Sequence, residues 1–176
     1  VCLREENCTI VICDNSTDVN VKRANQRYFE SNLRGHYLDM GGNQGLSRAY
    51  NRGIRIGHGE VVCLFDDDTT LSLEYFSQVE MAIGSNGSGV YIPIIESGDR
   101  MLSPLGVLGP LIYKIDEVSK IDLNTTTAFN TGMAITRDVA EMIPHDEECF
   151  LDFVDHAFCR DAHSHGVKFN LLKGVK

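Results

Sequence analysis

The chain has 176 residues, of which 43% are hydrophobic, so it is long enough for one soluble domain with its own core. Its 25 acidic residues outnumber its 16 Lys and Arg, and the formal net charge of -9 argues against a nucleic acid partner, because phosphate backbones require a basic face. No apolar run approaches the ~20 residues of a membrane-spanning helix, and no secretory signal is recognisable.

The first half of the chain predicts strands that alternate with helices. An apolar run at 9–14 is typical of a buried strand, and a polar turn follows it. Asn43 is the expected cap of a later helix, which Gly57 ends. This alternation indicates a parallel sheet with crossover helices. We expect strands at 9–14, 37–40 and 61–65, and helices at 19–31 and 46–56.

The second half of the chain has a different pattern. Leu73, Phe76, Val79 and Ile83 form one apolar stripe and predict a helix. Beyond it, Gly, Pro and Ser interrupt short strand-like runs, so we expect an antiparallel or mixed portion packed beside the parallel half. The expected elements are strands at 90–95 and 111–115, a turn feeding a short strand at 129–135, helices at 137–142 and 154–165, and a strand at 168–172.

Three consecutive aspartates, Asp66, Asp67 and Asp68, end the apolar run at 61–65. Carboxylates repel one another and are costly to desolvate, so three of them at the end of a buried strand require a cation. Oxygen ligands suit Mg²⁺ or Mn²⁺, which are usually shared with a substrate phosphate. We therefore expect a metal–diphosphate site at the carboxyl edge of the sheet. The alternative is a solvated turn that caps the next helix.

The chain contains six cysteines but no Cys-x-x-Cys pair, so a zinc or thioredoxin-like site is not indicated. Cys13 and Cys63 lie in strand-like runs, where cysteine behaves as a small hydrophobic residue. We expect reduced thiols and a cytoplasmic location. The six are Cys2, Cys8, Cys13, Cys63, Cys149 and Cys159.

A series of motifs along nearly the whole chain resembles the family-2 glycosyltransferases of the GT-A fold, and within that family it is most similar to bacterial rhamnosyltransferase-like members. The resemblance implies an α/β, Rossmann-like fold with a mixed, mostly parallel sheet flanked by helices. The motifs are Asp14-Asn15-Ser16, the run from Asn43 to Gly53, the run from Phe65 to Thr69, Asn130-Thr131-Gly132, and the run from Phe150 to His156.

The resemblance also implies how the domain is organised. Residues 1–176 would form one GT-A domain, with a nucleotide-binding half at about 1–85 and an acceptor-binding half at about 86–176. Such enzymes usually open with an extra apolar strand, and many carry a metal-binding His beyond the final strand. Neither is visible here, so we expect the chain to lack the first strand and the C-terminal end of that domain.

The function implied is inverting, metal-dependent transfer of a sugar, with rhamnose favoured, from a nucleoside-diphosphate donor to an acceptor. The donor would be a dTDP- or UDP-sugar, and the cofactor Mn²⁺ or Mg²⁺. The acceptor would be a glycan or a lipid-linked glycan in cell-wall or other polysaccharide synthesis. The expected location is the cytoplasm, including the inner face of the membrane through peripheral association.

Each motif gains a role from the same resemblance. Asp68 would be the main metal ligand, and Asp66 would contact the ribose, or the metal through water. Asp155 would be the general base that removes the acceptor proton, with Asp152 as the second candidate. The acceptor pocket would be bordered by Asn130, Thr131, Gly132 and His156. The donor would be bound by Asp14, Asn43, Gly45, Arg48, Asp66 and Asp67.

Every assignment has a plainer alternative. Asp14 forms a turn by itself, Asn43 and Gly45 only begin a helix, Arg48 lies in solvent, and the acids near 155 cap a helix. For the function, the alternatives are a non-catalytic nucleotide- or sugar-binding domain and a nucleotidyltransferase. The latter would need a glycine-rich phosphate loop near the start, which is not seen. An aspartyl-phosphate phosphohydrolase fits the aspartates but requires a downstream Lys and a paired-acid motif.

Overall fold

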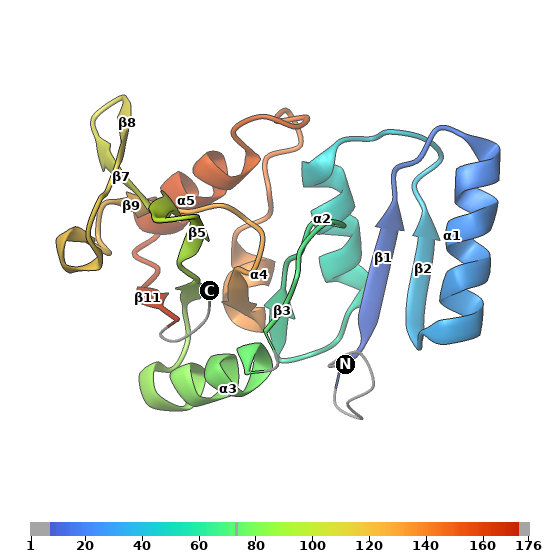
Figure 1. Ribbon diagram of the computed structural model, residues 1–176, viewed down its shortest axis with the longest axis horizontal. Coiled ribbons are helices and arrows are strands. Elements are labelled where there is room, and N and C mark those ends of the chain that lie inside the picture. The colour runs from blue at the N-terminus through green and yellow to red at the C-terminus, as the bar shows by residue number, and fades with distance from the viewer. Residues whose placement is uncertain (1–7, 73, 173–176) are drawn as a thin grey trace. The chain divides into compact units, whose positions relative to one another are not determined.

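The computed structural model describes residues 8–72 and 74–172, which fall into two compact units (Figure 1). Unit 1 comprises Val1–Glu60 and Pro144–Val154, and unit 2 comprises Val61–Ile143 and Asp155–Lys176. These units are defined by contacts within the chain, so the two functional halves expected from the sequence stay a prediction. Cys2 and Leu73, which entered the expectations above, lie outside the described residues.

Unit 1 is built on a parallel strand pair. β1 (Ile10–Asp14) and β2 (Gly35–Asp39) pair in parallel, with α1 (Val19–Asn32) as the connection between them. α1 begins at Asp18, whose carboxylate accepts hydrogen bonds from two backbone N–H groups of its first turn. The predicted order of strand, helix and parallel strand is therefore confirmed to within about two residues at each boundary.

The second helix of unit 1, α2 (Leu46–Ile56), packs directly over β1. Gly53 permits this close approach, because a Cβ at that position would lie 3.3 Å from the Sγ atom of Cys13. The Cys13 thiol also donates to the carbonyl of Ala49 at 3.2 Å. The apolar face of α2 thus holds the helix against the strand, and its polar face is left for other contacts.

Unit 2 contains a four-stranded sheet in the order β11-β4-β10-β3. β11 is parallel to β4, whereas β10 is antiparallel to both β4 and β3. β3 therefore differs from the expectation of a parallel partner, because the chain turns at residues 130–132 and β10 returns along β3. The strands are β3 (Val61–Cys63), β4 (Val90–Ile92), β10 (Ala134–Thr136) and β11 (Phe169–Leu171).

The core of unit 2 lies between this sheet and α3 (Tyr75–Asn86). Val79 of the predicted stripe is buried, and Phe76 and Ile83 pack partly buried beside it. Tyr75, which the stripe omitted, is 1% exposed and forms the centre of the cluster with Tyr91 and Leu172. The helix and its apolar face are thus confirmed.

The rest of unit 2 confirms the expected antiparallel portion. Pro93, which lacks an N–H donor, separates the predicted strand at 90–95 into β4 and β5. Two small antiparallel sheets follow, β5-β6 and β8-β7-β9. The remaining elements are β5 (Ile95–Ser97), β6 (Arg100–Ser103), β7 (Leu105–Leu108), β8 (Leu111–Lys114), a 3-10 helix at Val118–Lys120, β9 (Thr126–Thr127), α4 (Arg137–Met142) and α5 (Val154–Ser164).

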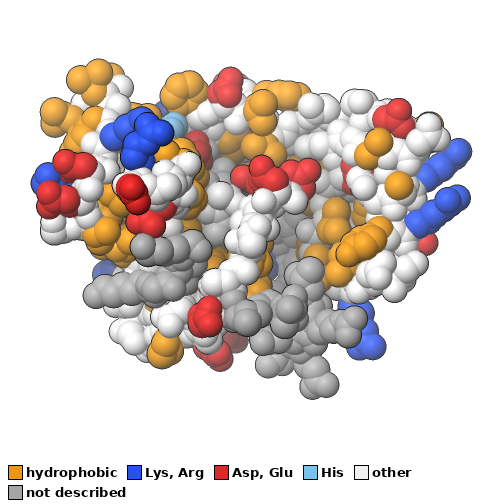
Figure 2. Space-filling model, in the orientation of Figure 1, with side chains coloured by type: hydrophobic (Ala, Val, Ile, Leu, Met, Phe, Trp, Pro, Cys, Tyr) orange, Lys and Arg blue, Asp and Glu red, His pale blue; other side chains and the backbone are white. Residues whose placement is uncertain are grey.

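Hydrophobic side chains gather on the surface over the β7-β8 hairpin (Figure 2), where Leu108, Leu111 and Tyr113 are each at least half exposed. Among the described residues, no helix has the length and apolar character needed to cross a membrane. The five described cysteines form no disulfide with one another.

Candidate active site

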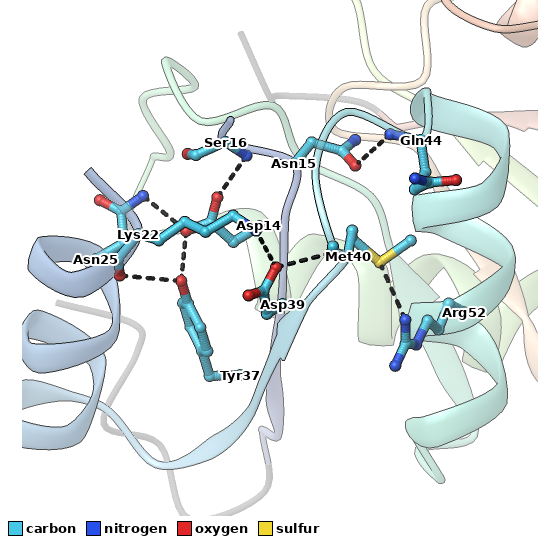
Figure 3. A network of polar contacts seen from close by, with 11 residues as sticks. Asp14, Asn15, Ser16, Lys22, Asn25, Tyr37, Asp39, Met40, Gln44 and Arg52 are labelled. Atoms are coloured by element: carbon cyan, nitrogen blue, oxygen red, sulfur yellow. Dashed lines mark hydrogen bonds and ion pairs between the residues drawn. The ribbon is translucent and has the colours of Figure 1, made fainter. Parts of the chain in front are cut away.

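Asp14 ends β1 and is 5% exposed (Figure 3). Its Oδ1 accepts from the backbone N–H of Ser16 at 2.7 Å, and its Oδ2 accepts from Asn25 Nδ2 at 2.9 Å and from the hydroxyl of Tyr37. Burial alone would raise the pKa of Asp14, but these hydrogen bonds outweigh it and lower the pKa to about 2. The turn expected after β1 is therefore confirmed, and the carboxylate is a fixed anion. Contact with a base or ribose would use its remaining lone pairs.

The loop before α2 is tied to the end of β1 by Asn15, which donates to the carbonyl of Gly45 and accepts from the N–H of Gln44. The prediction that Asn43 caps α2 is wrong: the N-cap is Gly45, and Asn43 instead accepts from the N–H of Gly45 at 3.1 Å. Gly45 has φ 85, and a Cβ there would lie 2.5 Å from the carbonyl oxygen of Phe150. Only glycine fits this position.

Two buried polar residues of α2, Ser47 and Asn51, hold segment 144–154 to this helix. Both lie in the motif from Asn43 to Gly53, but neither was given this role from the sequence. Ser47 donates to the carbonyl of Cys149 at 2.7 Å. Asn51 donates to the carbonyl of His145 at 2.8 Å and to Glu147 Oε1 at 3.1 Å, and it accepts from the N–H of His145 at 2.8 Å. Burial lowers the pKa of His145 to about 4, so this side chain is neutral at pH 7. The signal in the sequence was polar residues four apart on an otherwise apolar helix face.

The three aspartates lie in unit 2, in an exposed turn after β3. β3 itself ends at Cys63, so two further residues separate the strand from Asp66. The N–H of Thr69 donates to the carbonyl of Asp66 at 3.2 Å, which closes the turn. The three carboxylates therefore face solvent on a short, backbone-bonded loop.

The turn at Asn130-Thr131-Gly132 lies directly against this acidic turn. The hydroxyls of Thr131 and Thr69 are 2.5 Å apart, and the N–H of Asp66 donates to Thr131 Oγ1 at 3.4 Å. Gly132 donates its N–H to the carbonyl of Leu64 at 2.8 Å. The fold of unit 2 thus brings two of the predicted motifs together. Asp66 and Thr131, which are in contact, are 65 residues apart in the sequence.

The opening of α5 holds the predicted base. Asp155 lies in the first turn of α5, and its side chain is 20% exposed. Its Oδ1 accepts from the backbone N–H of His156 at 2.8 Å, and His156 Nδ1 lies 2.7 Å from the hydroxyl of Thr127 on β9. Asp152 belongs to unit 1 and is exposed in a turn. Phe153, which follows Asp152, has φ 62, an uncommon conformation for a bulky residue.

Arg48, expected at the donor, lies on the outward face of α2 in unit 1. Its Nε is 3.6 Å from Glu147 Oε2, and its Nη1 lies 3.5 Å from Gln44 Oε1. With Asp14, Asn43 and Gly45 it belongs to unit 1, whereas the acidic turn, the 130–132 turn and Asp155 belong to unit 2.

Whether this chain suits a divalent metal depends on the donors near the acidic turn. No group of three His, Cys, Asp or Glu side chains is gathered for a metal in the described parts of the chain. Mg²⁺, however, is usually bound by one or two carboxylates, with waters and substrate phosphates supplying the rest. The exposed carboxylates of Asp66 and Asp68 are donors of this kind. The Oδ1 atom of Asn130, in the adjacent turn, is buried and has no hydrogen-bond partner among the described residues. The donor set therefore fits a metal shared with a diphosphate.

The fold matches that of GT-A glycosyltransferases. S. aureus TarS 1–349 is similar over 96% of this chain and 49% of its own, with a TM-score of 0.65 and 16% sequence identity. The structure of the same protein in complex with UDP has the same scores. At this identity the likeness concerns the fold alone. The expected α/β, GT-A-type fold with a mixed sheet is thus confirmed.

The chain belongs to glycosyl transferase family 2, whose model matches residues 2–143. A curated relative, the dTDP-rhamnosyl transferase RfbF of Shigella flexneri, is 22% identical over 191 residues, covering 99% of this chain and 60% of RfbF. The chain therefore spans less than two thirds of that relative. Asp152, Asp155 and His156 lie beyond the matched residues, so this match does not bear on the roles expected for them.

Proposed function

We propose that this chain is the catalytic part of an inverting, metal-dependent glycosyltransferase. It would move a sugar from a nucleoside-diphosphate donor to a hydroxyl of a glycan or lipid-linked acceptor. The observation that carries the proposal is the contact between the acidic turn and the 130–132 turn, in a chain of glycosyl transferase family 2. Dense, exposed oxygen donors beside a second polar turn are suited to a metal-bound diphosphate.

Asp68 and Asp66 would hold Mn²⁺ or Mg²⁺ at the edge of unit 2. When bound there, the ion supplies positive charge opposite the diphosphate that leaves the sugar. Thr131 supports this edge, because its hydroxyl fixes both Thr69 and the N–H of Asp66. Asp67, in the same turn, would contact the donor. The other donor contacts in the proposal come from unit 1: Asp14, Asn43, Gly45 and Arg48.

Asp155 would act as the general base. Its Oδ1 is occupied by the N–H of His156, so Oδ2 is the atom that accepts the proton of the acceptor hydroxyl. The start of a helix favours a carboxylate in its charged form. As the proton moves to Asp155, the acceptor oxygen bonds to the anomeric carbon and the carbon–phosphate-oxygen bond breaks. Its electron pair leaves with the diphosphate, and attack opposite the leaving group inverts the sugar.

The substrates follow from the relatives only as a proposal. One relative is named a dTDP-rhamnosyl transferase, and a protein of similar fold was solved with UDP and with UDP-GlcNAc. We propose a dTDP- or UDP-sugar as donor, with dTDP-rhamnose first to be tried. Asn130, Thr131, Gly132 and His156 would border the acceptor, in a polysaccharide-synthesis reaction at the cytoplasmic side of the membrane.

Two variants of the complete protein test the mechanism. Asp68→Ala should abolish Mn²⁺-dependent binding of dTDP or UDP in calorimetry. Asp155→Asn should bind the nucleotide as the wild type does but lose transfer about 100-fold or more, because a positioned base contributes at least that factor. Asp99→Asn, an exposed aspartate in the β5-β6 turn, is the matched control and should change neither.

Near-normal transfer by the Asp155→Asn variant would remove the base assignment and direct attention to Asp152. Nucleotide binding that ignores both Mn²⁺ and Asp68 would remove the metal site. Metal-dependent binding with no turnover of any donor by the complete wild-type protein would favour a non-catalytic binding domain instead.

A further inference from the structure

Three arginines of α2 line an open hollow of about 240 Å³ on unit 1. They lie at positions four and three apart, so they share one face of the helix. All three are exposed, and the opposite face of α2 is buried against β1. The residues that line the hollow are Met40, Gln44, Arg48, Arg52, Arg55 and Glu147.

The hollow carries an excess of positive charge in a chain whose formal net charge is -9. Its lining has three cationic side chains and a single anionic one, Glu147. The ion pair of Glu147 with Arg48 is long, at 3.6 Å, and both side chains are about half exposed. A pair of this kind is weak. The excess of two positive charges is therefore not neutralised within the hollow.

Helix stability does not account for this arrangement. Like charges four apart on a helix destabilise it. A cation is favourable near the C-terminus of a helix, which suits Arg55 in the last turn, but it is unfavourable near the N-terminus. Arg48 is the third residue of α2. Its charge therefore does not stabilise the helix through the dipole.

Neutral neighbours hold two of the guanidinium groups over the hollow. Arg52 Nη1 lies 3.9 Å from the Sδ atom of Met40, as Figure 3 shows, and Arg48 Nη1 lies 3.5 Å from Gln44 Oε1. Thioether sulfur is a weak acceptor, and a guanidinium has five N–H donors. Most donors of Arg52 are thus available to a ligand.

We infer that this hollow binds a phosphate-bearing anion. The planar fork of arginine suits phosphate oxygens, and an excess of two charges favours a dianion over a single carboxylate. This binding needs no metal, and the arginines belong to α2 of unit 1, whereas the acidic turn belongs to unit 2. Arg48 is also one of the donor contacts proposed above, so Arg52 and Arg55 distinguish the hollow. The phosphate could belong to a small soluble compound or to a phospholipid headgroup.

The test uses the complete protein in EDTA, which removes any metal-dependent binding at the acidic turn. Pyrophosphate binding is measured by calorimetry, and vesicle binding by co-sedimentation with phosphatidylcholine vesicles that do or do not contain phosphatidylglycerol. The variant is Arg52→Gln with Arg55→Gln, which leaves Arg48 intact. The matched control, Arg23→Gln with Arg27→Gln, removes two exposed charges from α1 of the same unit. Thermal denaturation checks that both variants fold.

We expect the α2 variant to bind about tenfold more weakly or worse in at least one arm, and the α1 variant to bind as the wild type does. Loss with pyrophosphate identifies a soluble phosphate compound, and loss with anionic vesicles identifies a headgroup. Single substitutions of Arg52 and Arg55 should each give part of the loss. The inference is overturned if the wild type binds neither probe, or if the α1 and α2 variants lose binding equally.

Discussion

Replacing Asp14 with Asn should remove a pH-dependent part of the stability of this protein. The carboxylate is 5% exposed and accepts hydrogen bonds from Ser16, Asn25 and Tyr37. These bonds outweigh burial and lower the pKa from its ordinary 3.8 to about 2. At 1.36 kcal/mol per pH unit, that difference corresponds to about 2.4 kcal/mol of stability from the charged form.

The sign follows from the lowered pKa of the folded state. The unfolded chain binds the proton more readily, so the contribution is fully present above about pH 4 and is lost as the pH falls from about 4 to about 2. The assay is urea unfolding of wild type and Asp14→Asn, followed by circular dichroism at a series of pH values. The free energies of unfolding should differ by about 2 kcal/mol at pH 6 and converge near pH 2.

Asp99→Asn serves as the control for removing one acidic residue, because Asp99 is exposed in a turn. Its stability should follow the wild-type curve at every pH. If the Asp14→Asn difference stayed constant from pH 6 to pH 2, the stabilising effect would come from shape rather than charge. The account of the Asp14 network given above would then be wrong.

Two further substitutions test the contacts around the candidate site. Asn51→Ala removes three hydrogen bonds that hold segment 144–154, so we expect the free energy of unfolding in urea to fall by about 2–4 kcal/mol. The control Asn86→Ala removes one hydrogen bond at an exposed position and should lower it by less than about 1 kcal/mol. Equal losses in the two variants would contradict the role of Asn51 as an anchor. Thr131→Val removes the hydroxyl that contacts Thr69 and the N–H of Asp66, and should weaken Mn²⁺-dependent nucleotide binding about fivefold without a large change in thermal stability. Thr125→Val, which breaks an exposed hydrogen bond to Asp122, is its control, and unchanged binding by Thr131→Val would show that the acidic turn needs no such support.

Most helices and strands of this fold were predictable, because the spacing of apolar residues along the sequence indicates whether a segment forms a helix or a strand. The strand at 10–14 and the helices at 46–56 and 137–142 follow directly from apolar spacing and glycine ends. The partner of β3 was not predictable in the same way. Its apolar run suits a parallel or an antiparallel neighbour equally well, and only the return of the chain at Gly132 selects β10.

The position of the three aspartates just after a strand was predictable from the sequence, whereas the residues that support the neighbouring segments were not. The aspartates alone are a weak motif, and their role as a metal site stays a prediction. Asn51 and Ser47, four residues apart on an apolar helix face, carry only a weak signal of burial, since a polar residue on a helix is usually exposed. Likewise, Asn43 reads as a helix cap by composition, yet Gly45 takes that place because the carbonyl of Phe150 leaves no room for a Cβ. Long-range packing decided both cases.

The structure also separates the two acids that compete for the role of base. Asp152 lies in segment 144–154 of unit 1, exposed in a turn. Asp155 lies on α5 in unit 2, with Oδ1 bound to the N–H of His156, whose ring contacts Thr127 of β9. A general base must hold one geometry while a proton moves. Because one oxygen of Asp155 is fixed by a hydrogen bond, the helix residue suits the proposed role of base better than the turn residue does.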